Sequence, residues 1–147
     1  MIMGLNSPKW IPKKEDIDEK LEASNERELF VIGQIIIERI LDKIIIEIFH
    51  IPEKILDNTR FPMQLRIDLL SESDLLEEDL KKNVKGINTL RNWHTHRIPV
   101  PTNDVDGVIW KNLVYLGTAP GGEVDLLDKY RICVKQTFNE LEKMLDK

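Results

Sequence analysis

A long apolar stretch, residues 26–50, constrains the fold of this chain more than any other feature. Its polar residues recur at four-residue intervals, in the two series Gln34, Glu38, Asp42 and Arg39, Lys43, Glu47. A repeat of this period places the polar side chains on one narrow stripe of a helix whose other sides are apolar. We therefore predict a helix that Pro52 ends and that is covered on most sides, either in the centre of a bundle or against a second subunit.

The same stretch is nearly long enough to cross a bilayer, but it carries several charged residues. Each charge at mid-bilayer costs roughly 2.5–3.5 kcal/mol, so we predict a core helix and no membrane span. The N-terminus also lacks the apolar segment of a secretory signal. The single cysteine, Cys133, excludes an internal disulfide and is expected to be a buried, inert thiol. These features predict a cytoplasmic protein.

The 147 residues are expected to form a single domain that begins with an irregular N-terminal arm, residues 1–13. Further helices are predicted for residues 15–23, 61–70, 74–96 and 123–147, whereas residues 108–116 fit either a short helix or a strand. The sequence thus predicts an all-α, up-and-down bundle of four to five main helices.

Some details of these helices are also predicted. Ser24 or Asn25 is expected to cap the helix over residues 26–50, and Ser71 or Ser73 the helix over residues 74–96. In the helix over residues 61–70, the expected buried side chains are Leu65, Leu69 and Leu70.

The segment Arg91-Asn92-Trp93-His94-Thr95-His96 holds two of the three histidines of the chain. Around it, residues 81–97 contain five Lys or Arg and no acid, although the whole chain has a net charge of −5. Part of this concentration is helix electrostatics, because bases favour the C-terminal part of a helix. The remaining bases are also candidates for RNA binding, namely Lys81, Lys82, Lys85 and Arg97.

An arginine and a histidine are sufficient residue types for cleaving RNA without a metal. Arginine binds phosphate through a rigid fork, and histidine exchanges protons near neutral pH. Arg91 and His96 lie about 140° apart around a regular helix, so they converge only if the helix unwinds before Pro99 or if two copies meet across a twofold axis. His94 and His96 also have the spacing of half a metal site, but no further clustered His or Cys supports one, so we expect no metal and no cofactor.

Three segments together resemble the HEPN superfamily, in particular mannitol-operon-repressor-like proteins and HEPN-like proteins of unknown function. They are Glu38-Arg39 within the long apolar helix, FPMQLRIDLL (residues 61–70) and a long helix that closes with INTLRNWHTH (residues 87–96). The resemblance covers residues 26–97. It implies a HEPN-like helical bundle that forms a homodimer with two facing motifs. In active members it implies a metal-independent endoribonuclease, often in toxin–antitoxin systems, with an RNA substrate and a protein partner or antitoxin.

The resemblance also assigns roles to individual residues. Arg91 would stabilise the scissile phosphate, His96 would be the general acid or base, and Asn92 would orient groups by hydrogen bonding. Glu38 is either an accessory acid or part of an interhelical ion pair, and His94 either assists or lies in solvent. The alternative function is a non-catalytic regulatory or protein-interaction module, in which the motif only holds helices together. A third is nucleotide binding without turnover.

Overall fold

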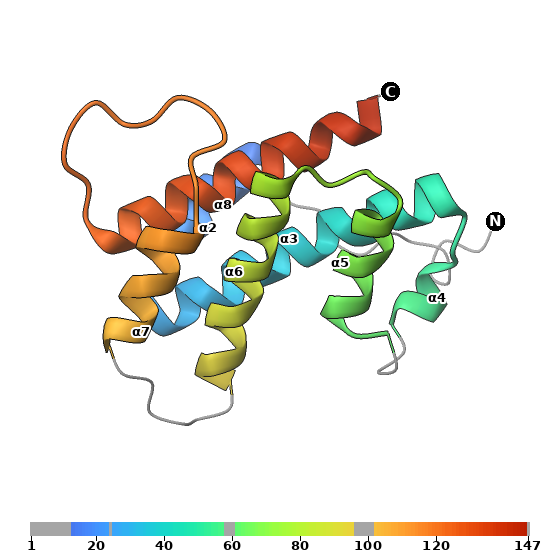
Figure 1. Cartoon of the computed structure of the whole chain (residues 1–147), viewed down its shortest axis with the longest axis horizontal. Coiled ribbons are helices and arrows are strands. Elements are labelled where there is room, and N and C mark those ends of the chain that lie inside the picture. Colours follow the sequence, from blue (N-terminus) through green and yellow to red (C-terminus); the bar gives the residue numbers. More distant parts are fainter. Residues whose placement is uncertain (1–12, 24, 58–60, 96–101, 147) are drawn as a thin grey trace.

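The computed structural model describes residues 13–23, 25–57, 61–95 and 102–146. These residues form helices and no strand, which confirms the all-α prediction (Figure 1). The elements are α2 (Lys14–Ala23), α3 (Glu26–Phe49), α4 (Glu53–Leu56), α5 (Met63–Glu72), α6 (Glu78–Thr95), α7 (Thr102–Gly107), the π-helix η1 (Val108–Asn112), α8 (Leu126–Glu142) and the 3-10 helix η2 (Lys143–Asp146). The predicted N-terminal arm lies outside the described residues, except for Lys13.

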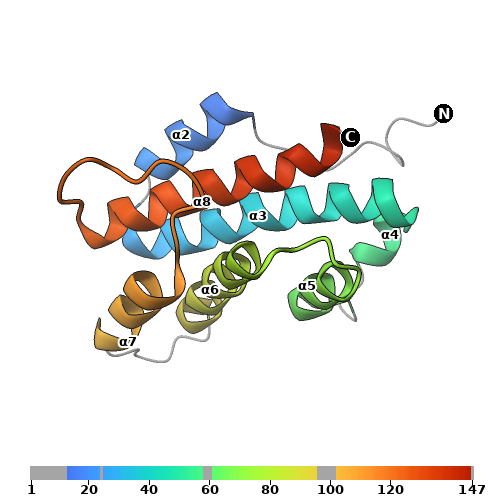
Figure 2. The same ribbon diagram turned by 45° about the horizontal axis from the view of Figure 1, so that its top comes forward.

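Helix α3 is the centre of the fold, and it contacts α2, α4, α5, α6 and α8. Helix α8 lies along α3 and runs in the same direction (Figure 1). Helices α5 and α6 cross α3 on one side and run antiparallel to each other, whereas α2 lies on the opposite side (Figure 2). Because α3 and α8 are parallel neighbours, the helices do not all alternate in direction as they would in a simple up-and-down bundle.

The burial of α3 agrees with its apolar sequence. Seven of its aliphatic side chains are at most 1% exposed: Leu29, Ile36, Ile37, Ile40, Leu41, Ile44 and Ile45. Each contributes roughly 1.5–3 kcal/mol through the removal of its apolar surface from water. The side chain of Asn25 accepts a hydrogen bond from the Glu28 N–H at 2.9 Å, which confirms the predicted cap. None of the described helices is both long enough and apolar enough to cross a membrane.

The corner between α5 and α6 differs from the prediction. Helix α5 continues to Glu72, so Ser71 lies inside it and Ser73 is its C-cap, and α6 begins at Glu78 rather than near residue 74. Asp74 adopts a left-handed conformation with φ 57°. Its N–H donates to Ser71 O, and the N–H of Leu75 donates to Leu70 O. These two bonds form a Schellman motif, which usually has glycine at the left-handed position. Because Asp74 occupies that position here, the sequence contains no glycine signal for the end of the helix.

The prediction for the buried face of α5 was right for Leu70 and wrong for Leu65. Leu65 is 40% exposed, Leu69 is half-buried and Leu70 is fully buried, whereas Arg66 is only 3% exposed. Met63, Ile67 and Leu70 form the apolar part of the buried face. Arg66 lies on this face because it is three residues after Met63 and four before Leu70.

The C-terminal half contains a shorter helix than predicted and a long connection. Helix α8 begins at Leu126, where Asp125 caps it by accepting from the Asp128 N–H, and the last turn, η2, is a 3-10 helix. Residues 108–112 form the π-helix η1. Of the two predicted alternatives for residues 108–116, a short helix or a strand, the first part of the segment is therefore helical. The buried Asn83 of α6 bonds both backbone groups of Val114 and thereby fixes the start of the connection.

Gly33 of α3 permits the close approach of α8. A Cβ at this position would lie 2.1 Å from Oη and 2.9 Å from Cζ of Tyr130, whose fully buried ring packs edge-to-face on Phe30. We therefore expect Gly33→Ala to lower the free energy of unfolding by about 1–3 kcal/mol, the usual cost of overpacking. Urea denaturation followed by circular dichroism measures this loss.

The matched control is Gly107→Ala. Gly107 has helical backbone angles, and a Cβ there would meet nothing within 4 Å. This variant should keep or raise the stability, by up to about 1 kcal/mol. A Gly33→Ala protein as stable as the Gly107→Ala protein would contradict the described packing of α3 against α8.

Candidate functional site

A polar cleft of about 600 Å³ lies between α3, α5 and α6. Three sets of residues line it. Gln34 and Glu38 come from α3, and Asn88, Arg91 and Asn92 come from α6. The third wall is formed by α5 and the segment before it, with Leu56, Asp57, Phe61, Pro62, Met63, Gln64 and Arg66.

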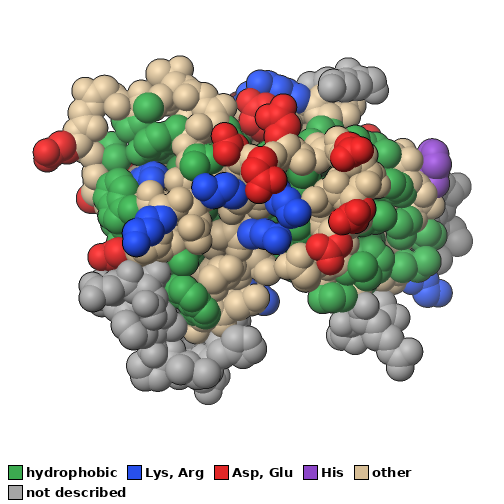
Figure 3. Space-filling view, viewed as in Figure 1, with side chains coloured by type: hydrophobic (Ala, Val, Ile, Leu, Met, Phe, Trp, Pro, Cys, Tyr) green, Lys and Arg blue, Asp and Glu red, His purple; other side chains and the backbone are tan. Residues whose placement is uncertain are grey.

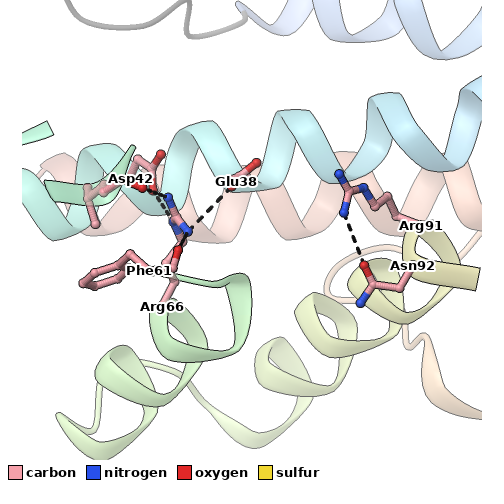
Figure 4. A network of polar contacts seen from close by, with 7 residues as sticks. Glu38, Asp42, Phe61, Arg66, Arg91 and Asn92 are labelled. Carbon is pink, nitrogen blue, oxygen red and sulfur yellow. Dashed lines mark hydrogen bonds and ion pairs between the residues drawn. The ribbon is translucent and has the colours of Figure 1, made fainter. Parts of the chain in front are cut away.

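The guanidinium of Arg66 forms one wall of this cleft (Figure 4). Its Nε donates to Asp42 Oδ1 at 2.5 Å, and its two terminal nitrogens donate to the carbonyl oxygens of Phe61, at 2.5 Å, and Leu56, at 2.7 Å. Nη1 also lies 3.7 Å from Glu38 Oε1. The guanidinium carbon is 5.4 Å from the centroid of the Phe61 ring, a cation–π distance.

These bonds make Arg66 a fixed part of the wall. Its side chain is 4% exposed and that of Asp42 is 6% exposed, so water screens the pair little. An ion pair this deeply buried offsets the desolvation of its charges only when the geometry is good and further hydrogen bonds are made. The two carbonyl acceptors supply those bonds for Arg66, whereas Asp42 Oδ2 is buried without a partner among the described residues. Arg66 is therefore a structural cation, which holds α5 against α3 and the segment before α5.

The opposite wall carries the predicted motif. Arg91 and Asn92 are half-buried on α6, and Arg91 Nη1 donates to Asn92 Oδ1 at 3.3 Å. In Figure 4, Glu38 lies on α3 between the side of Arg66 and the side of Arg91. Three residues that the sequence singled out, Glu38, Arg91 and Asn92, therefore line one cleft. The predicted interhelical ion pair of Glu38 is present, with Arg66 as its partner.

The structure describes only part of the segment that holds the two histidines of the motif. Helix α6 continues through Thr95, so the chain does not unwind between Arg91 and that residue. The side chain of His94 and the whole of His96 and Arg97 lie outside the described residues. Trp93 is half-buried and packs against the core.

The lysines predicted to bind RNA lie on α6 outside the cleft. Lys81 and Lys82 are half-buried and Lys85 is exposed. Lys81 and Lys85 precede Asn88 and Asn92, respectively, by two helical turns, so all four lie within about 60° on one side of the helix. Lys and Arg side chains gather where α6 starts, with Asp and Glu side chains next to them (Figure 3). The basic concentration is therefore local and continues along α6 toward the cleft.

Sequence analysis did not predict the other residues of the cleft as site residues, among them Gln34, Arg66 and Asn88. Gln34 was part of the polar stripe on α3, but nothing in that stripe distinguishes a cleft residue from a solvated one. The burial of Arg66 could have been predicted from the sequence, because its spacing from Met63 and Leu70 puts it on the same face of the helix. Asn88 carries no signal of its own in the sequence.

Two other kinds of site are relevant here, a metal site and a reactive thiol. Among the residues that the structure describes, no group of three His, Cys, Asp or Glu side chains could hold a metal ion. Cys133 is buried, as predicted, and burial raises the pKa of its thiol to about 11. Comparisons of the chain with protein-family models, curated proteins and solved structures found no match. The cleft is therefore identified from its own residues.

The Arg66–Asp42 pair provides a direct test of the cleft wall. Arg66→Met keeps most of the side-chain volume but leaves the Asp42 carboxylate buried without its cation. We expect a loss of about 3–5 kcal/mol in the free energy of unfolding, because an uncompensated buried charge remains. Chemical denaturation of the purified variant measures this quantity.

Lys143→Met is the control, because Lys143 pairs with Glu140 at 2.9 Å on the exposed surface. The loss there should stay below about 1 kcal/mol. The double variant Asp42→Leu/Arg66→Met should lose less than the two single variants added together. Equal, small losses for Arg66→Met and Lys143→Met would contradict a structural role for Arg66.

Proposed function

We propose that this protein is a metal-independent endoribonuclease of HEPN type, with its site in the cleft between α3, α5 and α6. One observation carries the proposal: Glu38, Arg91 and Asn92, which the sequence indicated as site residues, line the same cleft. The volume of about 600 Å³ suits a nucleotide-sized group, since ligand pockets span roughly 300–1,000 Å³.

The chemistry needs a cation and a proton carrier. The RNA 2′-oxygen attacks the adjacent phosphorus while its proton passes to a base, and the 5′-oxygen leaves with a proton from an acid. The products are a 2′,3′-cyclic phosphate and a 5′-hydroxyl. Arg91 is suited to hold the phosphate through its planar fork, and Asn92 lies within hydrogen-bonding distance of Arg91 to orient it. His96 exchanges the proton near neutral pH.

A second copy of the chain would complete the site. Arg91 and His96 diverge on a regular helix, and a twofold axis brings Arg91 of one copy to His96 of the other. Large apolar side chains are exposed next to cleft residues: Ile55 is 49% exposed beside Leu56, and Leu65 is 40% exposed between Gln64 and Arg66. These side chains support a homodimer whose interface borders the cleft.

A non-catalytic interaction module is the second candidate, and a specific observation favours it. The more buried arginine of the cleft, Arg66, already bonds Asp42 and two carbonyl groups within the chain. Glu38 and Asp57 add negative charge to the lining, which opposes the binding of phosphate. In this case the cleft residues hold the helices, and a protein or antitoxin partner binds elsewhere on the surface.

Cleavage of structured and unstructured RNA in the presence of EDTA separates the two candidates. Wild-type protein should cut RNA, and Arg91→Ala should lower the rate about 10²–10³-fold because the phosphate loses its cation. His96→Ala should lower it about 10²–10⁴-fold. Lys111→Ala, which removes an exposed cation from η1, is the control and should leave the rate unchanged. Absence of cleavage by wild type, or undiminished cleavage by the Arg91 and His96 variants, would sink the nuclease proposal.

The same two variants test the composite site. An equimolar mixture of Arg91→Ala and His96→Ala chains forms some dimers in which one site has both intact residues. Activity should therefore reappear on mixing if the site is shared between copies. A mixture as inactive as its components would place both residues in one chain.

A further inference from the structure

Two buried amide oxygens in the cleft lack a hydrogen-bond donor. Gln34 is 4% exposed, and its Oε1 has no partner among the described residues. Asn88 Oδ1 is likewise buried and without a partner in the described part of the chain. Both residues line the cleft, Gln34 from α3 and Asn88 from α6. A buried acceptor without a donor costs free energy, which a ligand bearing N–H groups would offset.

A third acceptor lines the same cleft. Glu38 is one helical turn after Gln34 on α3, so both side chains project to the same side of the helix. Its carboxylate is 31% exposed and lines the cleft. The walls formed by α3 and α6 therefore present two amide oxygens and a carboxylate. Since all three groups accept hydrogen bonds, this set favours a ligand that offers more than one N–H donor.

The remaining lining residues are suited to the rest of a nucleotide. The half-buried Phe61 supplies an aromatic ring, and unpaired bases stack on such rings in RNA-binding proteins. Arg91 supplies a cation on the α6 wall for a phosphate. Among the bases, guanine alone presents adjacent donors, N1–H and the N2 amino group, on its pairing edge. Adenine and cytosine pair a donor with an acceptor there, and uracil has one donor between two acceptors.

We propose that the cleft selects a guanine base, with Gln34, Glu38 and Asn88 accepting hydrogen bonds from its pairing edge. This inference rests on the proposed function in that it uses the same cleft, and it adds the base preference of the substrate. The base stacks near Phe61, and the attached phosphate lies toward Arg91. Gln34 and Asn88 are specificity residues and take no part in proton transfer.

Binding of the four 5′-mononucleotides to the full chain tests this proposal, because they contain no bond for the enzyme to cut. Isothermal titration calorimetry should give at least tenfold tighter binding of GMP than of AMP, CMP or UMP. Gln34→Met and Asn88→Leu, which keep similar shapes but lack the acceptor, should each reduce the preference about tenfold. Circular dichroism and the Tm of each variant establish that it is folded.

Two further variants separate the acceptor from the fold. Gln64→Met makes the same change as Gln34→Met at an exposed position of the cleft, where the Gln64 side chain donates to Asp68 at 2.8 Å, and it should keep the preference. Asn88→Asp keeps acceptor oxygens in the same shape and should also keep it. Equal binding of the four nucleotides, or no binding of any at millimolar concentration, would overturn the proposal. So would loss of preference in Gln64→Met together with its retention in Gln34→Met.

A second part of the experiment distinguishes guanine in an RNA chain from guanine in a free nucleotide. A 2′-O-methyl GpA dinucleotide should bind more tightly than GMP if the cleft takes an RNA chain, whereas GMP should bind more tightly if it takes a free nucleotide. Either result supports guanine recognition. Guanine-selective binding with no RNA cleavage would remove the proposed nuclease function and keep this inference. RNA cleavage with no base preference at the cut sites would keep the proposed nuclease function and remove this inference.

Discussion

The buried guanidinium of Arg66 connects the elements that form one side of the molecule. It bonds Asp42 of α3, the carbonyl group at the end of α4 and the carbonyl group of Phe61 ahead of α5. Helix α5 is short, and one exposed leucine, Leu65, faces away from the core. Met63, Ile67 and Leu70 supply its buried apolar face, and the bonds of Arg66 add a charged attachment to α3. Loss of either charge would leave the other buried without compensation.

The position of α5 determines the chemistry of the cleft. With α5 fixed against α3, the space between α3, α5 and α6 is an open cleft lined mostly by polar groups. Groups of its own chain hold Arg66 on one wall, and our proposal assigns the phosphate to Arg91 on the α6 wall. The acceptors of α3 and α6, in turn, favour a base that donates. The buried carboxylate of Asp42 and two carbonyl groups hold the guanidinium of Arg66, and Arg91 donates to the neighbouring amide of Asn92.

Sequence patterns predicted the helical elements better than their ends and contacts. The polar stripe on α3 predicted its length and burial, because 24 residues of one period leave little ambiguity. The predicted end of α5 was wrong, because Asp74 occupies a left-handed position where glycine is usual. Of the cleft, Arg91 and Asn92 were predicted from their motif, and Glu38 was predicted from the family resemblance as an accessory acid or an ion-pair partner. Gln34 and Asn88 were not, because the lack of a partner is a property of the packed structure and leaves no trace in the sequence.

The central claim is that Arg66 is a fixed structural cation while Arg91 contacts the ligand. Side-chain Nε–Hε signals of arginine, recorded by NMR during titration with a 2′-O-methyl oligonucleotide that cannot be cleaved, test this claim most directly. The Arg91 signal should shift in a saturable manner. The Arg66 signal should be visible before any ligand is added, because Asp42 accepts its hydrogen, and should change little. Arg131, which bonds Leu21 O away from the cleft, is the internal reference. A stationary Arg91 signal, or equal shifts of all three, would contradict the claim.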